Sequence, residues 1–262
     1  MDDSGDLHGK VALVLGSTAG VGLRTAERLA RGGAHVMLNG RSAARGAEAL
    51  AGLRATGADC DFAAGDLTDP AALQEVIDAA QTRFGGIDML VSAGAESRIG
   101  VRPFSEIAPE DIGPGLLDRF LPRILPVRLA LPALKARGAG SVVLLTSDAA
   151  RHPTPGESIV GAAAAGVLLA TKVLARELSR DRIRVNAVAM TITSDTPTWD
   201  RIFSGDDFTR KLFEKAVGRF PSGAAPTASE VAEVAAFLAS PASGQVTGQT
   251  ISVNGGLSFG GW

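Results

Sequence analysis

A glycine-rich turn near the N-terminus constrains the fold more than any other feature of this 262-residue chain. The turn, GSTAGVG at residues 16–22, follows the apolar run VALVL at 11–15 and precedes residues 23–31, where apolar side chains recur at helical spacing. A strand, a glycine turn and a helix in this order are typical of dinucleotide binding. Glycines permit the tight turn and the approach of a pyrophosphate, and the helix N-terminus offers N–H groups and the positive end of the helix dipole.

The turn is therefore predicted to hold the phosphates of a cofactor. The residues expected to contribute are Gly16, Ser17, Thr18, Gly20, Val21 and Gly22. The alternative is an ordinary turn between a strand and a helix that binds no ligand. The position of the turn at the first strand of an alternating chain favours the dinucleotide interpretation.

Apolar segments and helical patterns alternate along the rest of the chain. Further strands are predicted at residues 34–39, 59–63, 87–91, 141–146, 183–188 and 248–253. Helices are predicted at residues 43–55, 70–84, 159–179 and 228–239, with Ser42 and Asp69 as N-caps. This alternation predicts an α/β protein: a Rossmann-type, doubly wound sheet of seven parallel strands with helices on both faces. No linker or repeat divides the chain, so we expect a single domain over residues 1–262, with ligands at the carboxyl ends of the strands.

Two stretches depart from this regular alternation. Five prolines between residues 109 and 132 predict a kinked or broken helix, because proline removes a backbone donor and clashes with the preceding turn. Residues 190–222 mix polar and aromatic side chains, namely Trp199, Phe203, Phe208, Phe213 and Phe220. This second stretch is either a lid over an apolar substrate or a packed structural insertion.

Composition narrows the class of protein and its partners. A net charge of −2 argues against nucleic acid, and the single cysteine, Cys60, cannot form an intramolecular disulfide and fits a reducing compartment. The N-terminus MDDS lacks the basic-then-apolar order of a signal peptide, and no apolar run approaches the length that spans a bilayer. We therefore expect a cytoplasmic protein with a small-molecule substrate, without a nucleic-acid or membrane partner. No metal site is predicted.

Four motifs together resemble the short-chain dehydrogenase/reductase family. They are the glycine turn, GDLTD at residues 65–69, IRVNAV at 183–188 and VTGQTISVNGG at 246–256. The resemblance covers nearly the whole chain, from Lys10 to about Gly256, and implies a Rossmann fold and a nicotinamide cofactor. It also implies a homo-oligomer, a dimer or tetramer, associating through the proline-rich stretch and the helix at 159–179.

The resemblance also implies how the cofactor is held. Asp66 would bind the adenine amino group and Leu67 would line that pocket, while Ser92, Ala93 and Gly94 correspond to the family's Asn-Asn-Ala-Gly stretch, one residue shorter. Gly40 falls where members that prefer NAD carry an acid for the ribose hydroxyls. Arg41 follows it and could pair with a 2′-phosphate, unless it is a solvated loop arginine. The expected cofactor is NADP(H), with NAD(H) as the alternative.

The catalytic half of the family pattern is incomplete in this sequence. The family uses an Asn, a Ser, a Tyr and a Lys, and Ser147 matches the Ser. The Tyr and Lys positions fall on Val160 and Ala164, the Asn position falls on Arg119, and the chain contains no tyrosine. Carbonyl reduction needs a proton donor at the substrate oxygen, and valine and alanine supply neither a proton nor a charge. The sequence is therefore interpreted as a divergent member that lacks the catalytic Tyr and Lys.

Few side chains could take over the missing chemistry. Ser147 can hydrogen-bond a carbonyl, the imidazole of His152 is a candidate acid, and Arg119 could stabilise an oxyanion. His152 could equally be a surface-loop histidine, and Arg119 could form an ion pair at a helix surface or subunit contact. Asp148 could satisfy backbone N–H groups of its own turn.

Three functions remain open on the sequence. The first is an atypical NAD(P)(H)-dependent oxidoreductase acting on a carbonyl, a hydroxyl or an activated alkene of a small organic substrate. The second is an inactive subunit that pairs with an active homologue in a hetero-oligomer. The third is a non-redox catalyst that uses the same pocket.

Overall fold

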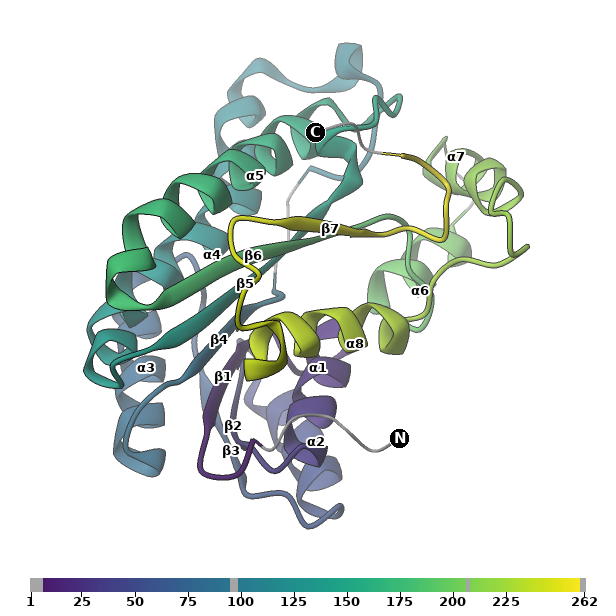
Figure 1. Ribbon diagram of the computed structural model, residues 1–262. Coiled ribbons are helices and arrows are strands. Elements are labelled where there is room, and N and C mark those ends of the chain that lie inside the picture. The colour runs from purple at the N-terminus through teal and green to yellow at the C-terminus, as the bar shows by residue number, and fades with distance from the viewer. Residues whose placement is uncertain (1–6, 95–98, 206–207, 260–262) are drawn as a thin grey trace.

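A single parallel sheet organises the computed structural model, which describes residues 7–94, 99–205 and 208–259. The strand order is β3-β2-β1-β4-β5-β6-β7, so the predicted seven-stranded sheet is confirmed (Figure 1). The strands are β1 (Val11–Leu15), β2 (His35–Gly40), β3 (Cys60–Ala64), β4 (Met89–Ser92), β5 (Gly140–Ser147), β6 (Ile183–Met190) and β7 (Thr250–Val253). The order reverses direction between β1 and β4, and open α/β sheets bind their ligands at such a point.

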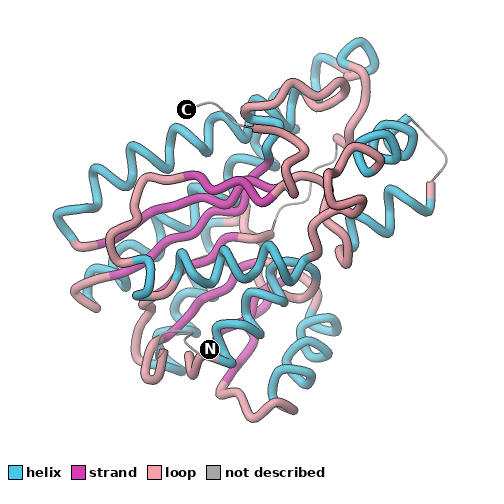
Figure 2. Tube along the Cα trace, turned by 45° about the vertical axis from the view of Figure 1, so that its right-hand side comes forward, coloured by secondary structure: helices cyan, strands magenta, loops and turns pink. Residues whose placement is uncertain are grey.

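Helices cover both faces of the sheet (Figure 2). The longer ones are α1 (Gly20–Arg31), α2 (Ala43–Arg54), α3 (Pro70–Phe84), α4 (Pro109–Ala136), α5 (Ser158–Leu178), α6 (Pro197–Ser204), α7 (Phe208–Val217) and α8 (Ala228–Ala239). Ser42 and Asp69 cap α2 and α3 as predicted, because each side chain accepts a hydrogen bond from a backbone N–H of the first turn.

Two apolar cores lie on opposite faces of the sheet. Alternate residues of β1 divide between them: Ala12 and Val14 pack with α1, α2 and α8, whereas Leu13 and Leu15 pack with α3, α4 and α5. All four side chains are fully buried. This two-sided burial explains why the strands read as continuous apolar runs rather than as alternating patterns, and it confirms the doubly wound arrangement.

The expected break in the proline-rich stretch is wrong. Helix α4 runs without interruption over 28 residues and contains Pro114, Pro122, Pro126 and Pro132. Because Pro126 has no N–H, it leaves the Pro122 carbonyl without its helical donor, and the Ser92 hydroxyl donates to that carbonyl instead at 2.5 Å. Packing against the sheet and this side-chain donor offset the cost of the prolines.

The segment between β6 and α8 folds into α6, α7 and their connecting turns. Ile192, Phe213 and Phe220 are buried in a third, smaller apolar cluster, and Trp199 and Phe203 pack against it with ring centroids 4.2 Å apart. In Figure 1 these two helices project beyond the carboxyl end of the sheet. The aromatic residues therefore hold the segment together as a packed unit, as the second interpretation of this stretch expects.

Helix α5 corrects the expectation that no apolar run is long enough to span a bilayer. The stretch Ser158–Asp181 has the length and the apolar composition of a membrane-spanning helix. In this fold, however, buried side chains of α5 such as Val167 and Ala175 pack in the core beneath the sheet. A long core helix of a folded domain has the same length and apolar composition, so these two properties are weak support for a membrane span.

Candidate active site

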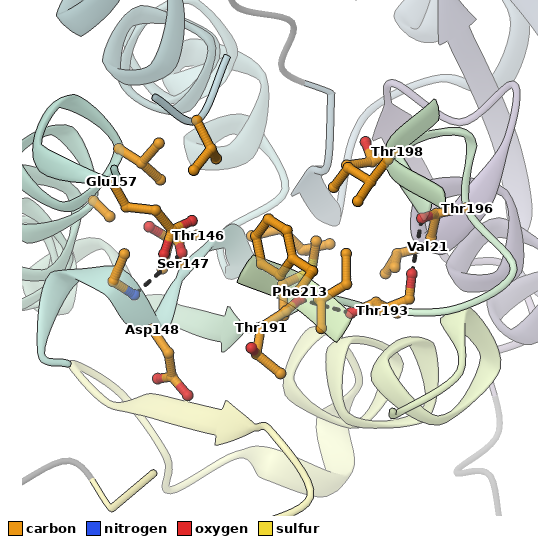
Figure 3. A pocket seen from close by; sticks show the side chains of 18 of the residues that line it. Val21, Thr146, Ser147, Asp148, Glu157, Thr191, Thr193, Thr196, Thr198 and Phe213 are labelled. Atoms are coloured by element: carbon orange, nitrogen blue, oxygen red, sulfur yellow. Dashed lines mark hydrogen bonds between the residues drawn. The ribbon is translucent and has the colours of Figure 1, made fainter. Parts of the chain in front are cut away.

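A cavity of about 720 Å³ opens at the carboxyl ends of the central strands. The glycine turn after β1, residues 93–94 after β4, and the ends of β5 and β6 form its floor. Residues of α6 and α7 form a wall of the cavity (Figure 3), and Leu257 and Ser258 after β7 also line it. The cavity therefore lies where the strand order reverses, which is the predicted place for a ligand.

Contacts within the glycine turn leave no room for side chains. Gly16 has a φ of +71°, and a Cβ there would meet the Gly94 Cα at 2.2 Å. A Cβ at Gly22 would meet the Gly16 carbonyl oxygen at 2.2 Å. Gly20 has a φ of +54° and faces Thr196 of the α6 segment. The three glycines therefore let the turn pack closely against the end of β4 while its backbone stays open to the cavity.

The N-terminus of α1 points into the cavity and is suited to an anion. Its N-cap, Ala19, has no side chain that could accept from the first-turn N–H groups, and that turn contains no acidic residue. The orphan N–H groups and the helix dipole are therefore available to a phosphate. Arg45, at the start of α2, also lines this end of the cavity. Sequence reasoning missed Arg45 and considered Arg41 alone.

The predicted cofactor residues divide into two groups. Those that line the cavity are Gly16, Thr18, Gly20, Val21, Gly22, Ala93 and Gly94. The side chains of Ser17 and Ser92 are directed into the protein: Ser17 Oγ donates to the Val14 carbonyl, and Ser92 Oγ donates to the Pro122 carbonyl. Both serines are fully buried, so these side chains stabilise the strand ends rather than face the cavity.

Asp66, Leu67 and Arg41 do not line the cavity itself and lie beside its glycine-rich end. A Cβ at Gly94 would meet Leu67 Cδ1 at 2.9 Å, which places Leu67 next to the cavity floor. Asp66 accepts from the backbone N–H and the hydroxyl of Thr68, and these bonds together with the nearby positive charge of Arg41 hold its pKa below the usual range.

Ser147, Arg119 and His152 line the same cavity, together with Val160 and Ala164. Ser147 Oγ accepts from the Ala149 N–H at 3.2 Å, which leaves its own proton for a ligand. Arg119 Nη2 donates to the Ile99 carbonyl at 3.0 Å, whereas its buried Nε has no partner among the described residues. His152 is exposed at the cavity edge. The three predicted catalytic residues therefore line one cavity.

The Asp148 carboxylate does not bond to the backbone of its own turn, so the interpretation that it satisfies N–H groups there is wrong; only its backbone carbonyl accepts from the N–H groups of Arg151 and His152. Its buried carboxylate accepts from Ser252 Oγ at 2.7 Å and from Asn254 Nδ2 at 2.5 Å, and Arg151 lies 3.5 Å away. Ser252 belongs to β7 and Asn254 follows it directly. Asp148 therefore fastens the C-terminal wall of the cavity to the end of β5.

Sequence reasoning missed two charged residues in this site. Arg123 is buried within α4 and donates to the carbonyls of Leu145 and Gly94; burial, and then the charge of Arg119, lower its pKa to about 10. Glu157, at the start of α5, lines the cavity, and burial raises the pKa of its carboxyl. The sequence gives no clear signal for Arg123, because Asp118, Arg119 and Arg128 are charged residues of the same helix.

Comparison with known proteins places this architecture in a family. The family described as Enoyl-(Acyl carrier protein) reductase matches residues 16–258. A rabbit (Oryctolagus cuniculus) protein named dehydrogenase/reductase SDR family member 4 is 30% identical over 95% of this chain and 94% of its own length. The chain is a short-chain dehydrogenase/reductase. The resemblance expected from the four sequence motifs is thereby confirmed.

Two further proteins are similar to this short-chain dehydrogenase/reductase over nearly the whole length of both chains. The 2,3-dihydroxy-2,3-dihydro-p-cumate dehydrogenase of Pseudomonas putida is 33% identical over 97% of this chain and 96% of its own length. A short-chain oxidoreductase from Pseudomonas aeruginosa PAO1, solved with NADPH bound and described as containing an atypical catalytic center, is 31% identical. It matches with a TM-score of 0.89 over 98% of this chain and 99% of its own.

Proposed function

We propose that this short-chain dehydrogenase/reductase is an atypical NADP(H)-dependent oxidoreductase. Its substrate is a small organic molecule with a carbonyl, a hydroxyl or an activated alkene. The observation that carries the proposal is one continuous cavity that joins the glycine turn to Ser147 and Arg119. A cofactor held at the turn and a substrate held at Ser147 would therefore share one cavity.

The residues at the glycine-rich end fit a dinucleotide. The turn exposes backbone N–H groups, the N-terminus of α1 has no side-chain cap, and Arg45 adds a positive charge beside it. Arg45 and Arg41 are the side chains that would favour a 2′-phosphate, which supports NADP(H) over NAD(H). Asp66 and Leu67 would hold the adenine. The bound nicotinamide would supply or accept a hydride.

The chain's own residues would orient and polarise the substrate. The Ser147 hydroxyl is available to donate to the substrate oxygen, and the Arg119 guanidinium would stabilise negative charge that develops there. Val160 and Ala164 form apolar wall where the family places Tyr and Lys. The relative from P. aeruginosa, which is described as having an atypical catalytic center, supports the view that a member of this family can depart from the usual residues.

Calorimetric titration with NADPH and NADH tests the proposal. We expect NADPH to bind more tightly, and Arg45→Ala to raise its Kd about tenfold through loss of an ion pair while leaving the Kd of NADH unchanged. Arg31→Ala, at the exposed far end of α1, is the matched control and should change neither value.

Two outcomes would contradict the proposal. Absence of binding for both cofactors would make the glycine turn a structural feature only. Binding of NADPH without its oxidation across a panel of ketones, diketones and activated alkenes would favour an inactive subunit.

A further inference from the structure

Glu157 lies at the start of α5, close to the two positions where the family carries its catalytic Tyr and Lys. It lies three residues before Val160 and seven before Ala164, so all three positions share one face of the helix. All three line the cavity, as does Ser147 at the end of β5. Figure 3 shows the Glu157 side chain entering the cavity from the α5 side, where Thr146 and Ser147 also project.

The Glu157 carboxyl does not serve the structural role that its position suggests, which is to cap the helix. Glu157 is the N-cap residue of α5, yet its side chain makes no capping hydrogen bond to the helix. The groups that lower its pKa against the effect of burial are the Thr154 hydroxyl and the positive charge of Arg119 on α4. A carboxyl that is largely removed from water, faces a cavity and leaves its helix uncapped is a candidate for chemistry.

We propose that Glu157 is the proton donor and acceptor of this active site, standing in for the family's tyrosine. The inference rests on the proposed function. In the reducing direction the carbonyl carbon gains a hydride from NADPH, the O–H bond of the Glu157 acid breaks, and its proton bonds to the carbonyl oxygen. The products are an alcohol, NADP⁺ and a Glu157 carboxylate, whose negative charge the positive charge of Arg119 favours. In the oxidising direction the same carboxylate takes the proton from the hydroxyl.

The charges around Glu157 suit a group that must alternate between two states. Burial favours the neutral acid and raises its pKa, whereas Arg119 and the Thr154 hydroxyl favour the carboxylate. Other charged or titratable groups on the surrounding elements include Arg45, Arg102, Asp118, Arg123, Asp148, His152, Arg201, Lys215 and Arg219. Burial and the charge of Arg119 therefore act in opposite directions on a carboxyl that, in general acid–base catalysis, must both give up and regain a proton.

Carbon-13 NMR of protein with labelled glutamate carboxyls tests the ionisation without any turnover. Glu157→Gln assigns the resonance. We expect it to titrate above about 4.3, the pKa of an ordinary glutamate, and to titrate higher still in Arg119→Met, where the stabilising cation is gone. A resonance that titrates at or below the ordinary value would show a permanently ionised partner of Arg119 and would overturn the proposal.

Turnover with an activated diketone such as phenanthrenequinone tests the role itself. We expect Glu157→Gln to slow NADPH oxidation about 10²- to 10⁴-fold while the calorimetric Kd for NADPH is unchanged. Glu157→Asp should recover part of the rate, and Glu177→Gln, an exposed position on the same helix, should retain all of it.

The outcomes separate this inference from the proposed function. Full turnover in Glu157→Gln overturns the inference and leaves the oxidoreductase intact. A wild-type protein that binds no NADPH, or binds it and never oxidises it, overturns both.

Discussion

The carboxylate of Asp148 offers a quantitative test of how this site is assembled. Asp148→Asn keeps one acceptor oxygen, which can still serve Ser252, but it turns an amide NH₂ toward the NH₂ of Asn254. One hydrogen bond to a charged group is lost, at a cost of about 2 kcal/mol. Arg151, whose side chain is only 15% exposed, loses its carboxylate at 3.5 Å, which adds about 1 kcal/mol.

The expected destabilisation is therefore about 3 kcal/mol. For a chain of this size it corresponds to a fall in Tm of roughly 6–12 °C. Calorimetric thermal unfolding measures the change, with Asp78→Asn on the exposed face of α3 as the matched control, expected within about 0.5 kcal/mol of wild type. If Asp148→Asn unfolds together with the control, the contacts to Ser252 and Asn254 do not hold the C-terminal wall, and the reasoning fails.

Three further changes have defined expectations. Gly22→Ala would place a Cβ 2.2 Å from the Gly16 carbonyl oxygen, so we expect NADPH binding to be lost in calorimetry; an unchanged Kd would contradict the close packing of the turn. Ser92→Ala removes the donor to the Pro122 carbonyl and should cost about 1–3 kcal/mol in urea unfolding, whereas a loss below about 0.5 kcal/mol would show that the carbonyl finds another donor. Because burial raises the pKa of Glu157 in the folded protein, ionisation there costs stability as pH rises from the unfolded value of about 4.3 through the folded value. The Tm of Glu157→Gln relative to wild type should therefore rise from pH 4 to pH 8, and a constant difference would refute this sign.

The sheet could be predicted from the sequence because its strands are buried on both faces. In a chain whose strands and helices alternate, a continuous apolar run such as Val11–Leu15 is typical of a strand that is buried on both faces. The predicted strand bounds agree with the structure within two residues. Helix α4 could not be predicted in the same way. Its prolines argue for a break, and the Ser92 hydroxyl that compensates one of them comes from a distant strand.

The site residues also differ in whether the local sequence reveals them or whether their role depends on contacts with distant parts of the chain. Counting from Ser147 along the family pattern leads to Val160 and Ala164 and passes over Glu157, which matters only because α5 turns its first residues into the cavity. Arg123 is likewise inconspicuous among prolines, since its partners are the carbonyls of Leu145 and Gly94 on other elements. A residue whose role depends on neighbours that only folding brings close leaves no periodic pattern in the sequence.

The fastening of the C-terminal segment by Asp148 and Asn254 has a practical consequence for probing this protein. Leu257 and Ser258 line the cavity, so a fluorophore attached in place of the exposed Phe259 would lie near the cavity and respond to an arriving ligand. Leu7 precedes β1 and bonds to Gly32, which places it at the amino ends of the strands, on the other side of the sheet from the cavity. Leu7 itself is buried, so a second fluorophore at the exposed neighbouring residue His8 would be the internal reference, and the ratio of the two signals would report occupancy in a single sample.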